Sequence, residues 1–177
     1  MEKTRSIDFD TLSLKDALDM AELVEQEAKD RYEEFADQMD IHHNPEAARF
    51  FRFMLGVEAK HEDKLAQKRK ALFGTEPRTV HRGMIFDIEA PEYDEARATM
   101  TVRQALDAAL RSETKAFEFF DGALKRVKDA QVRELFEHLR EEEREHIELV
   151  KKEIAKLGPD AGKPPPDDDY GDDPVAL

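Results

Sequence analysis

Residues 51–65 read FRFMLGVEAKHEDKL, and this stretch decides how the rest of the chain is interpreted. Its apolar residues recur every three or four positions, which is the spacing of one face of an α-helix. Glu58 and His61 stand on that same face, where the pattern leads one to expect leucine. An ionised carboxylate is costly to bury unless a partner compensates its charge. The stretch therefore predicts a helix that carries metal ligands on its buried side.

A second copy of the pattern occupies residues 136–150, FEHLREEEREHIELV, with Glu143 and His146 in the matching positions. Each half also has an earlier glutamate on an apolar stripe, Glu25 in the first half and Glu113 in the second. Both of these glutamates are followed by alanine three residues on and by an aromatic residue seven residues on. The repeat predicts two equivalent half-sites that face each other.

Capping signals divide the chain into four helices. The predicted starts are, in chain order, Ser13 with Asp16, Asn44 with Pro45, Thr101 with Gln104, and Asp129. The second helix should end near Gly74, with its apolar stripe running to Leu72, and the fourth near Leu157. Short turns make the first two and the last two helices antiparallel neighbours. The connection over residues 74–100 is long enough to cross the bundle and to set the third helix parallel to the second.

The fold class is therefore all-α: one four-helix bundle over residues 1–157, made of two antiparallel hairpins with one long crossover. A geometric test supports it, because residues at equal height in a hairpin lie symmetrically about its turn. The midpoint of Glu25 and Glu58 falls between residues 41 and 42, and that of Glu113 and Glu143 falls at residue 128. Both midpoints lie at the predicted turns.

Composition excludes several classes of function. With no cysteine among 177 residues, disulfides, iron–sulfur centres and thiol nucleophiles are ruled out. A net charge of −14 argues against nucleic-acid binding. No apolar run has the length of a membrane span and the start of the chain is polar, so a cytoplasmic protein is expected. The Asp- and Pro-rich tail, residues 158–177, is expected to be disordered.

The candidate ligands define a metal site. They are Glu25, Glu58, His61, Glu113, Glu143 and His146. Glutamate and histidine three residues apart on a helix can reach one ion, and four carboxylates with two imidazoles are the ligand set of a dinuclear site in a helix bundle. Two divalent ions would balance four negative charges. Oxygen and imidazole donors suit iron or manganese; zinc would bind but would be redox-silent.

A purely structural interpretation treats the same residues as solvated faces of a charged bundle. It does not explain why they interrupt apolar stripes and repeat between the halves. The neighbouring Glu141, Glu142, Glu145 and Glu148 are expected on the wet face of the last helix, and His138 is expected to be solvated. Tyr32 either packs in the core or supports the site through a hydrogen bond to a ligand, because a buried hydroxyl needs a partner and a ligand carboxylate is the nearest acceptor.

Residues 25–36, EQEAKDRYEEFA, resemble the first-helix signature of rubrerythrin-type proteins in the ferritin-like superfamily, and the similarity extends over about residues 14–157. The resemblance implies a di-iron centre with Glu58 and Glu143 as bridging ligands. It further implies that Glu25 and His61 complete the ligands of one iron, and that Glu113 and His146 complete those of the other. Tyr32 matches the tyrosine that supports the site through a hydrogen bond.

The chain departs from the rubrerythrin pattern in three respects. Without cysteines it has no rubredoxin module, so electrons must come from a separate donor protein or from Fe(II). The extra glutamate one turn after the third-helix ligand is replaced by Ala116. Phe120 and Asp121 occupy the region where a second supporting tyrosine is expected. Resemblance to bacterioferritin is partial, because Ala59 replaces the haem-ligating methionine.

The leading hypothesis is an oxidoreductase that reduces hydrogen peroxide or oxygen in the response to oxidative stress. The alternative is an iron-handling protein that oxidises Fe(II) for storage or transfer, and a third possibility is a metal that only staples a scaffold. The resemblance also implies a homodimer.

Overall fold

The computed structural model describes residues 7–41, 43–85 and 101–158. Within these ranges the chain is helical and contains no strand. The elements are α1 (Leu14–Ile41), α2 (Pro45–Phe73), the 3₁₀ turn η1 (Arg82–Met84), α4 (Val102–Leu124) and α5 (Ala130–Ala155). The acidic tail, and most of the crossover, lie outside the described residues.

The predicted caps are confirmed. The Ser13 hydroxyl accepts the amide of Asp16, and the Asn44 side chain accepts the amide of Ala47. Thr101 and Gln104 form a complete capping box, and the Asp129 side chain accepts two amides at the start of α5. These bonds satisfy amides that have no partner inside a helix. The last helix ends at Ala155, two residues before the predicted end. Its final turn closes through a hydrogen bond from Lys156 N to Glu153 O, which spans three residues instead of the four of an α-helix.

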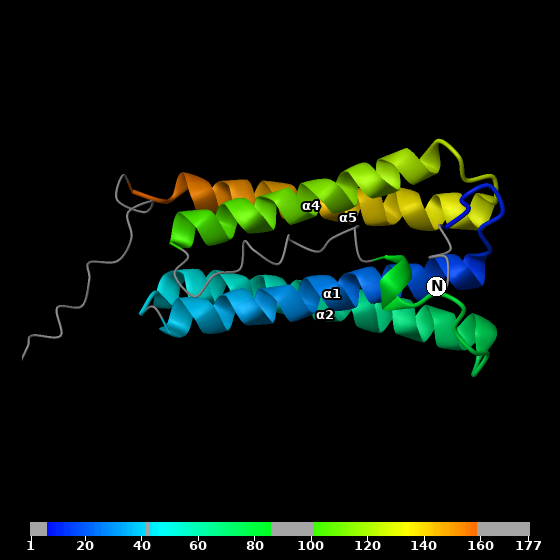
Figure 1. Cartoon of the computed structure of the whole chain (residues 1–177), viewed down its shortest axis with the longest axis horizontal. Helices are drawn as coiled ribbons and strands as arrows, with labels where there is room; N and C mark the ends of the chain where they lie inside the picture. Colours follow the sequence, from blue (N-terminus) through cyan, green and yellow to red (C-terminus); the bar gives the residue numbers. More distant parts are fainter. Residues whose placement is uncertain (1–6, 42, 86–100, 159–177) are drawn as a thin grey trace, which may run out of the picture.

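The four helices form the predicted bundle with one long crossover (Figure 1). The two hairpins, α1 with α2 and α4 with α5, lie side by side along the long axis. Helix α2 ends at one end of the bundle and α4 begins at the other, so α4 runs parallel to α2. The end of α2 at Phe73 and the start of α4 at Val102 therefore lie at opposite ends of the bundle.

The core consists of two hydrophobic clusters. One contains the first half of α1 with the C-terminal part of α4 and the N-terminal half of α5, including Leu18, Phe120 and Phe136. The other contains the second half of α1 with the N-terminal parts of α2 and α4, including Phe35 and Phe51. Residues 25–31 of α1, which lie between its contributions to the two clusters, include a buried glutamate. The candidate metal layer thus has dry packing above and below it.

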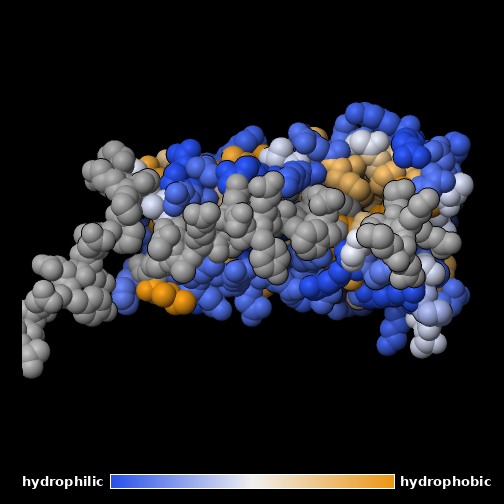
Figure 2. Space-filling model, in the orientation of Figure 1, coloured by the Kyte–Doolittle hydropathy of each residue, from blue (hydrophilic) through white to orange (hydrophobic). Residues whose placement is uncertain are grey.

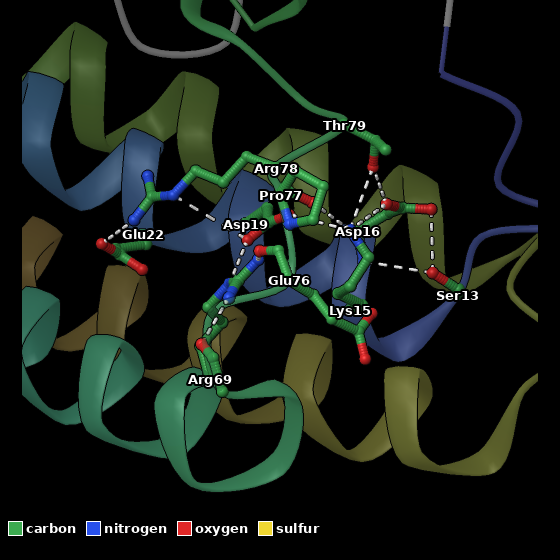
Figure 3. Close-up of polar contacts among 11 residues, drawn as sticks. Ser13, Lys15, Asp16, Asp19, Glu22, Arg69, Glu76, Pro77, Arg78 and Thr79 are labelled. Atoms are coloured by element: carbon green, nitrogen blue, oxygen red, sulfur yellow. Dashed lines mark hydrogen bonds and ion pairs between the residues drawn. The ribbon is translucent and has the colours of Figure 1, made fainter.

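The start of the crossover is tied to the bundle by a buried ion pair (Figure 3). Asp19 in α1 is fully buried, and its carboxylate accepts a hydrogen bond of 2.7 Å from Arg69 Nε in α2. The same guanidinium donates to the carbonyl oxygens of Gly74 (3.1 Å) and Glu76 (2.6 Å). Gly74 caps α2 with a positive φ of 56°, a backbone conformation that glycine adopts without strain. Arg69 therefore fixes the path of the chain as it leaves α2.

Most of the coloured surface in Figure 2 is hydrophilic, with smaller apolar areas between the charged side chains. Leu72 was expected on the buried stripe of α2, but this prediction is wrong, because the residue is 53% exposed. The buried face of the last turn follows steps of four residues from Leu65 through Arg69 to Phe73, which turns Leu72 outward.

Among the described residues, no helix is both long and apolar enough to cross a bilayer.

Candidate metal centre

The six predicted ligands converge at one level of the bundle. Glu25 comes from α1, Glu58 and His61 from α2, Glu113 from α4, and Glu143 and His146 from α5. Five of the six are buried and His61 is partly buried. The geometric expectation drawn from the hairpin midpoints is therefore met. That these side chains bind metal remains a prediction.

The first half-site is built around His61. Its Nδ1 atom lies 3.7 Å from Glu25 Oε2 and 3.7 Å from Glu58 Oε2. Both carboxylates thus approach the same ring nitrogen from different helices. An ion beside Nδ1 would have donors from α1 and α2 within reach.

The second half-site is built around His146. Its Nδ1 atom lies 3.1 Å from Glu58 Oε1, 3.3 Å from Glu113 Oε2 and 3.7 Å from Glu143 Oε2. Glu58 presents one oxygen to each imidazole, as a carboxylate between two ions would. The rings of His61 and His146 are stacked nearly parallel, with 5.3 Å between their centres and 8° between their planes. The two half-sites are therefore adjacent and face each other.

Burial and mutual repulsion dominate the electrostatics of the site. Burial raises the pKa of the Glu58 carboxyl, and the neighbouring carboxylates of Glu25 and Glu113 raise it further against the opposing effect of His146. Burial likewise raises the pKa of Glu143, helped by Glu113 and Glu58. Without a cation, these carboxyl groups are driven towards the protonated form.

The remaining groups respond differently. Burial would raise the pKa of Glu113, but the interaction with His146, whose Nδ1 lies 3.3 Å from Glu113 Oε2, outweighs burial and holds that pKa below its usual value. Burial and the nearby His146 lower the pKa of His61 to about 4, so its imidazole is neutral at pH 7. A neutral imidazole offers a lone pair, which is the form that binds metal.

A second observation also indicates that these donor atoms suit a metal ion. Several donor atoms are buried without a hydrogen bond of good geometry among the described residues: Glu58 Oε1, His61 Nδ1, Glu113 Oε2 and Glu143 Oε2. Buried polar atoms almost always have partners, so an unsatisfied group that points inward requires an explanation. Divalent cations supply one, because they would accept these lone pairs and offset the charge.

Tyr32 contacts the second half-site through one hydrogen bond. Its side chain is fully buried, and its hydroxyl donates a hydrogen bond to Glu113 Oε1. Burial and the charges of Glu113 and Glu58 raise the pKa of Tyr32, so the phenol keeps its proton and remains a donor. The bond leaves Glu113 Oε2 directed towards His146. The hydroxyl therefore donates to the carboxylate of a candidate ligand, as the sequence led us to expect.

Sequence reasoning missed two residues beside the site. Glu142 was expected on the wet face of α5, but its side chain is only 14% exposed and its Oε1 lies 3.4 Å from Nε2 of His61. Arg31 is 5% exposed and acts electrostatically on both Glu113 and Glu143. The contact of Glu142 with His61 depends on how α2 packs beside α5, so no local pattern in the sequence indicated it. Glu141, Glu145 and Glu148 are exposed, as predicted.

A family model described as Rubrerythrin matches residues 16–154, which include all six candidate ligands and Tyr32. The chain belongs to the rubrerythrin family. Members of this family typically bind iron, and the described carboxylate and imidazole groups could hold a metal. Family membership and the observed bundle together support a di-iron, ferritin-like protein.

One solved structure is similar over nearly its whole length. It is the crystal structure, at 2.00 Å resolution, of an uncharacterized conserved protein from Magnetospirillum magnetotacticum MS-1. The two sequences are 30% identical, and the match covers 83% of this chain and 97% of the other with a TM-score of 0.71. The comparison with curated proteins finds no match.

The chain differs from the expected family pattern at the positions that the sequence indicated. Ala116, at the position of the additional glutamate, is fully buried and leaves no carboxylate there. Phe120 is also fully buried and packs edge-on against Phe136, with 5.4 Å between ring centres. The region expected to hold a second tyrosine is thus part of the apolar core.

Proposed function

We propose that this protein binds two iron ions through the six converging side chains and uses them to reduce hydrogen peroxide or oxygen. The observation that supports the proposal best is the position of Glu58, which offers one carboxylate oxygen to each of two stacked imidazoles inside a buried layer. Glu25 and His61 would complete one ion, and Glu113 and His146 the other. Glu143 would be a bridging carboxylate between the two ions, as Glu58 would.

The reduction of one peroxide molecule to two waters consumes two electrons and two protons, and bound Fe(II) ions would supply the electrons. The protein's own contribution is positional. Tyr32 holds Glu113 in place, and the hydrophobic clusters on either side of the layer limit water around it. Because the chain has no cysteine, no thiolate-held electron carrier is present within its 177 residues. Reduction between turnovers would come from a separate donor.

Rapid mixing of the Fe(II)-loaded protein with peroxide tests the proposal. We expect two irons per chain and oxidation that is faster than that of Fe(II) in buffer, followed by absorption of a ferric pair. Glu58→Ala should bind less iron and lose the fast phase. Glu145→Gln, which removes an exposed charge from α5, is the matched control and should behave like the wild type. Oxidation no faster than in buffer would reject the proposed reaction.

Iron handling is the alternative, since Fe(II) can itself be the reductant when no electron carrier is built in. In that case iron added in excess would be oxidised beyond two ions per chain and would be retained or transferred. Retention of only two ions after repeated additions would exclude storage. A purely structural metal would be excluded by an apo form that stays folded and exchanges metal rapidly.

Assembly as a homodimer remains a prediction. Light scattering coupled to size exclusion would measure it, and a mass of one chain at micromolar concentration would contradict it.

A further inference from the structure

The two half-sites are not equivalent on their outer side. Relative to the ligand Glu143, His138 lies five residues earlier and Glu142 one residue earlier in α5. The matching positions before the ligand of α2 are Phe53 and Val57. One half of the repeat thus has an imidazole and a carboxylate where the other has only apolar side chains.

These two polar residues connect the surface to the first half-site. Glu142 Oε1 lies 3.2 Å from His138 Nε2 and 3.4 Å from His61 Nε2. The exposure of the side chains falls along this line, from 68% at His138 through 14% at Glu142 and 13% at His61 to 3% at Glu25. A continuous series of nitrogen and oxygen donors therefore leads from solvent to the buried ligand.

Glu142 can also share an ion with the inner ligands. Donor atoms of Glu25, His61 and Glu142 all lie within 4.8 Å of one another. The second half-site has no such outer carboxylate at the matching position, which is Val57. Its imidazole, His146, is 4% exposed against 13% for His61. The first half-site is thus the more accessible of the two.

We propose that His138 and Glu142 form a loading site where a divalent cation binds first before it passes to Glu25 and His61. This inference rests on the proposed metal centre. A hydrated ion loses its waters stepwise, so protein donors at the surface ease its transfer into a dry layer. An acidic group at the mouth of a site also raises the local concentration of cations and can speed association by about tenfold or more.

Lys64 provides a test of the electrostatic part of this proposal. It is exposed on α2, and its charge acts on both His61 and Glu142. An ammonium near the route repels an approaching divalent ion. Removing its charge should therefore speed loading, whereas removing Glu142 should slow it.

The experiment follows Co(II), a redox-stable probe, binding to the full chain after metal has been removed with a chelator. Stopped-flow absorption gives the rate of binding, and equilibrium titration gives the number of ions per chain. We expect Glu142→Gln to slow loading about tenfold or more. His138→Ala should slow it less and Lys64→Gln should speed it. The matched control is Glu134→Gln, which removes one exposed carboxylate a helical turn before His138. It should leave the rate unchanged.

In each of these variants the final number of bound ions should equal that of the wild type. Unchanged rates in both Glu142→Gln and His138→Ala would overturn the loading site while leaving the metal centre intact. Loss of one ion at equilibrium in Glu142→Gln, with His138→Ala unaffected, would also overturn it and make Glu142 a ligand or positioning residue of His61. Failure of the wild type to bind two ions would instead reject the proposed function itself.

Discussion

Replacing Glu143 by glutamine should stabilise the metal-free protein and remove the stability that metal provides. The side chain is 2% exposed and lies among other carboxylates, and its pKa is raised by burial and by Glu113 and Glu58. Without metal, folding must keep this carboxyl protonated or bury its charge. Glutamine has nearly the same shape but carries no charge, so the variant avoids that cost while losing one anionic ligand.

The magnitude follows from linkage. An unfolded glutamate has a pKa of about 4.3, so holding it protonated in the folded state at pH 7 costs at most about 4 kcal/mol. The buried amide of glutamine offsets part of this gain through an imperfect hydrogen bond, at a cost of about 1–3 kcal/mol. The metal-free variant should therefore be about 1–3 kcal/mol more stable than the wild type. At one hundred times the dissociation constant, metal adds about 2.7 kcal/mol to the wild type.

The pH dependence has a definite sign. A carboxyl with a raised pKa in the folded state contributes its full stability below the unfolded pKa and loses it as pH rises through the folded pKa. The advantage of Glu143→Gln should therefore shrink as pH falls from 7 to 5, by about 2.7 kcal/mol at most. The difference is expected to be largest in the neutral range.

Urea denaturation in the presence of a chelator, and again with saturating Mn(II), measures both effects. Glu145→Gln, exposed on the same helix, is the control and should change stability by less than about 0.5 kcal/mol. The predicted stabilisation fails if the metal-free variant is less stable than the wild type at pH 7 and pH 5 alike. It also fails if Mn(II) stabilises the variant as much as it stabilises the wild type.

Three further substitutions test interactions that hold the helices and one candidate ligand in position. Asp19→Ala leaves the guanidinium of Arg69 without its buried partner and should lower the free energy of unfolding by about 3–5 kcal/mol, measured in urea. Gly74→Ala meets no neighbouring atom but must adopt a positive φ, so a loss of about 1 kcal/mol is expected in the same assay; no loss would show that the turn relaxes. Tyr32→Phe removes the hydrogen bond to Glu113 and should cost about 1–3 kcal/mol, with weaker Co(II) binding by titration; unaltered binding would mean that the hydroxyl does not position this carboxylate.

Much of the fold could be predicted from the sequence because its signals are local. Caps such as Asn44 before Pro45 and the Thr101–Gln104 box satisfy amides within a single turn, so they mark helix starts without reference to any other helix. The convergence of the candidate ligands was also predictable. Helical periodicity sets the face on which Glu58 and His61 lie, and the hairpin turns set their height relative to Glu25.

The surroundings of the site were decided by tertiary packing. Periodicity alone placed Glu142 on the wet face of α5, but the position of α2 beside it determines that this carboxylate contacts His61. In the same way, the Asp19–Arg69 pair joins residues fifty positions apart, and no local pattern indicates it. A helix's own sequence determines which side chains share a face, whereas the rotation and spacing of neighbouring helices determine what each side chain contacts at the edges of that face.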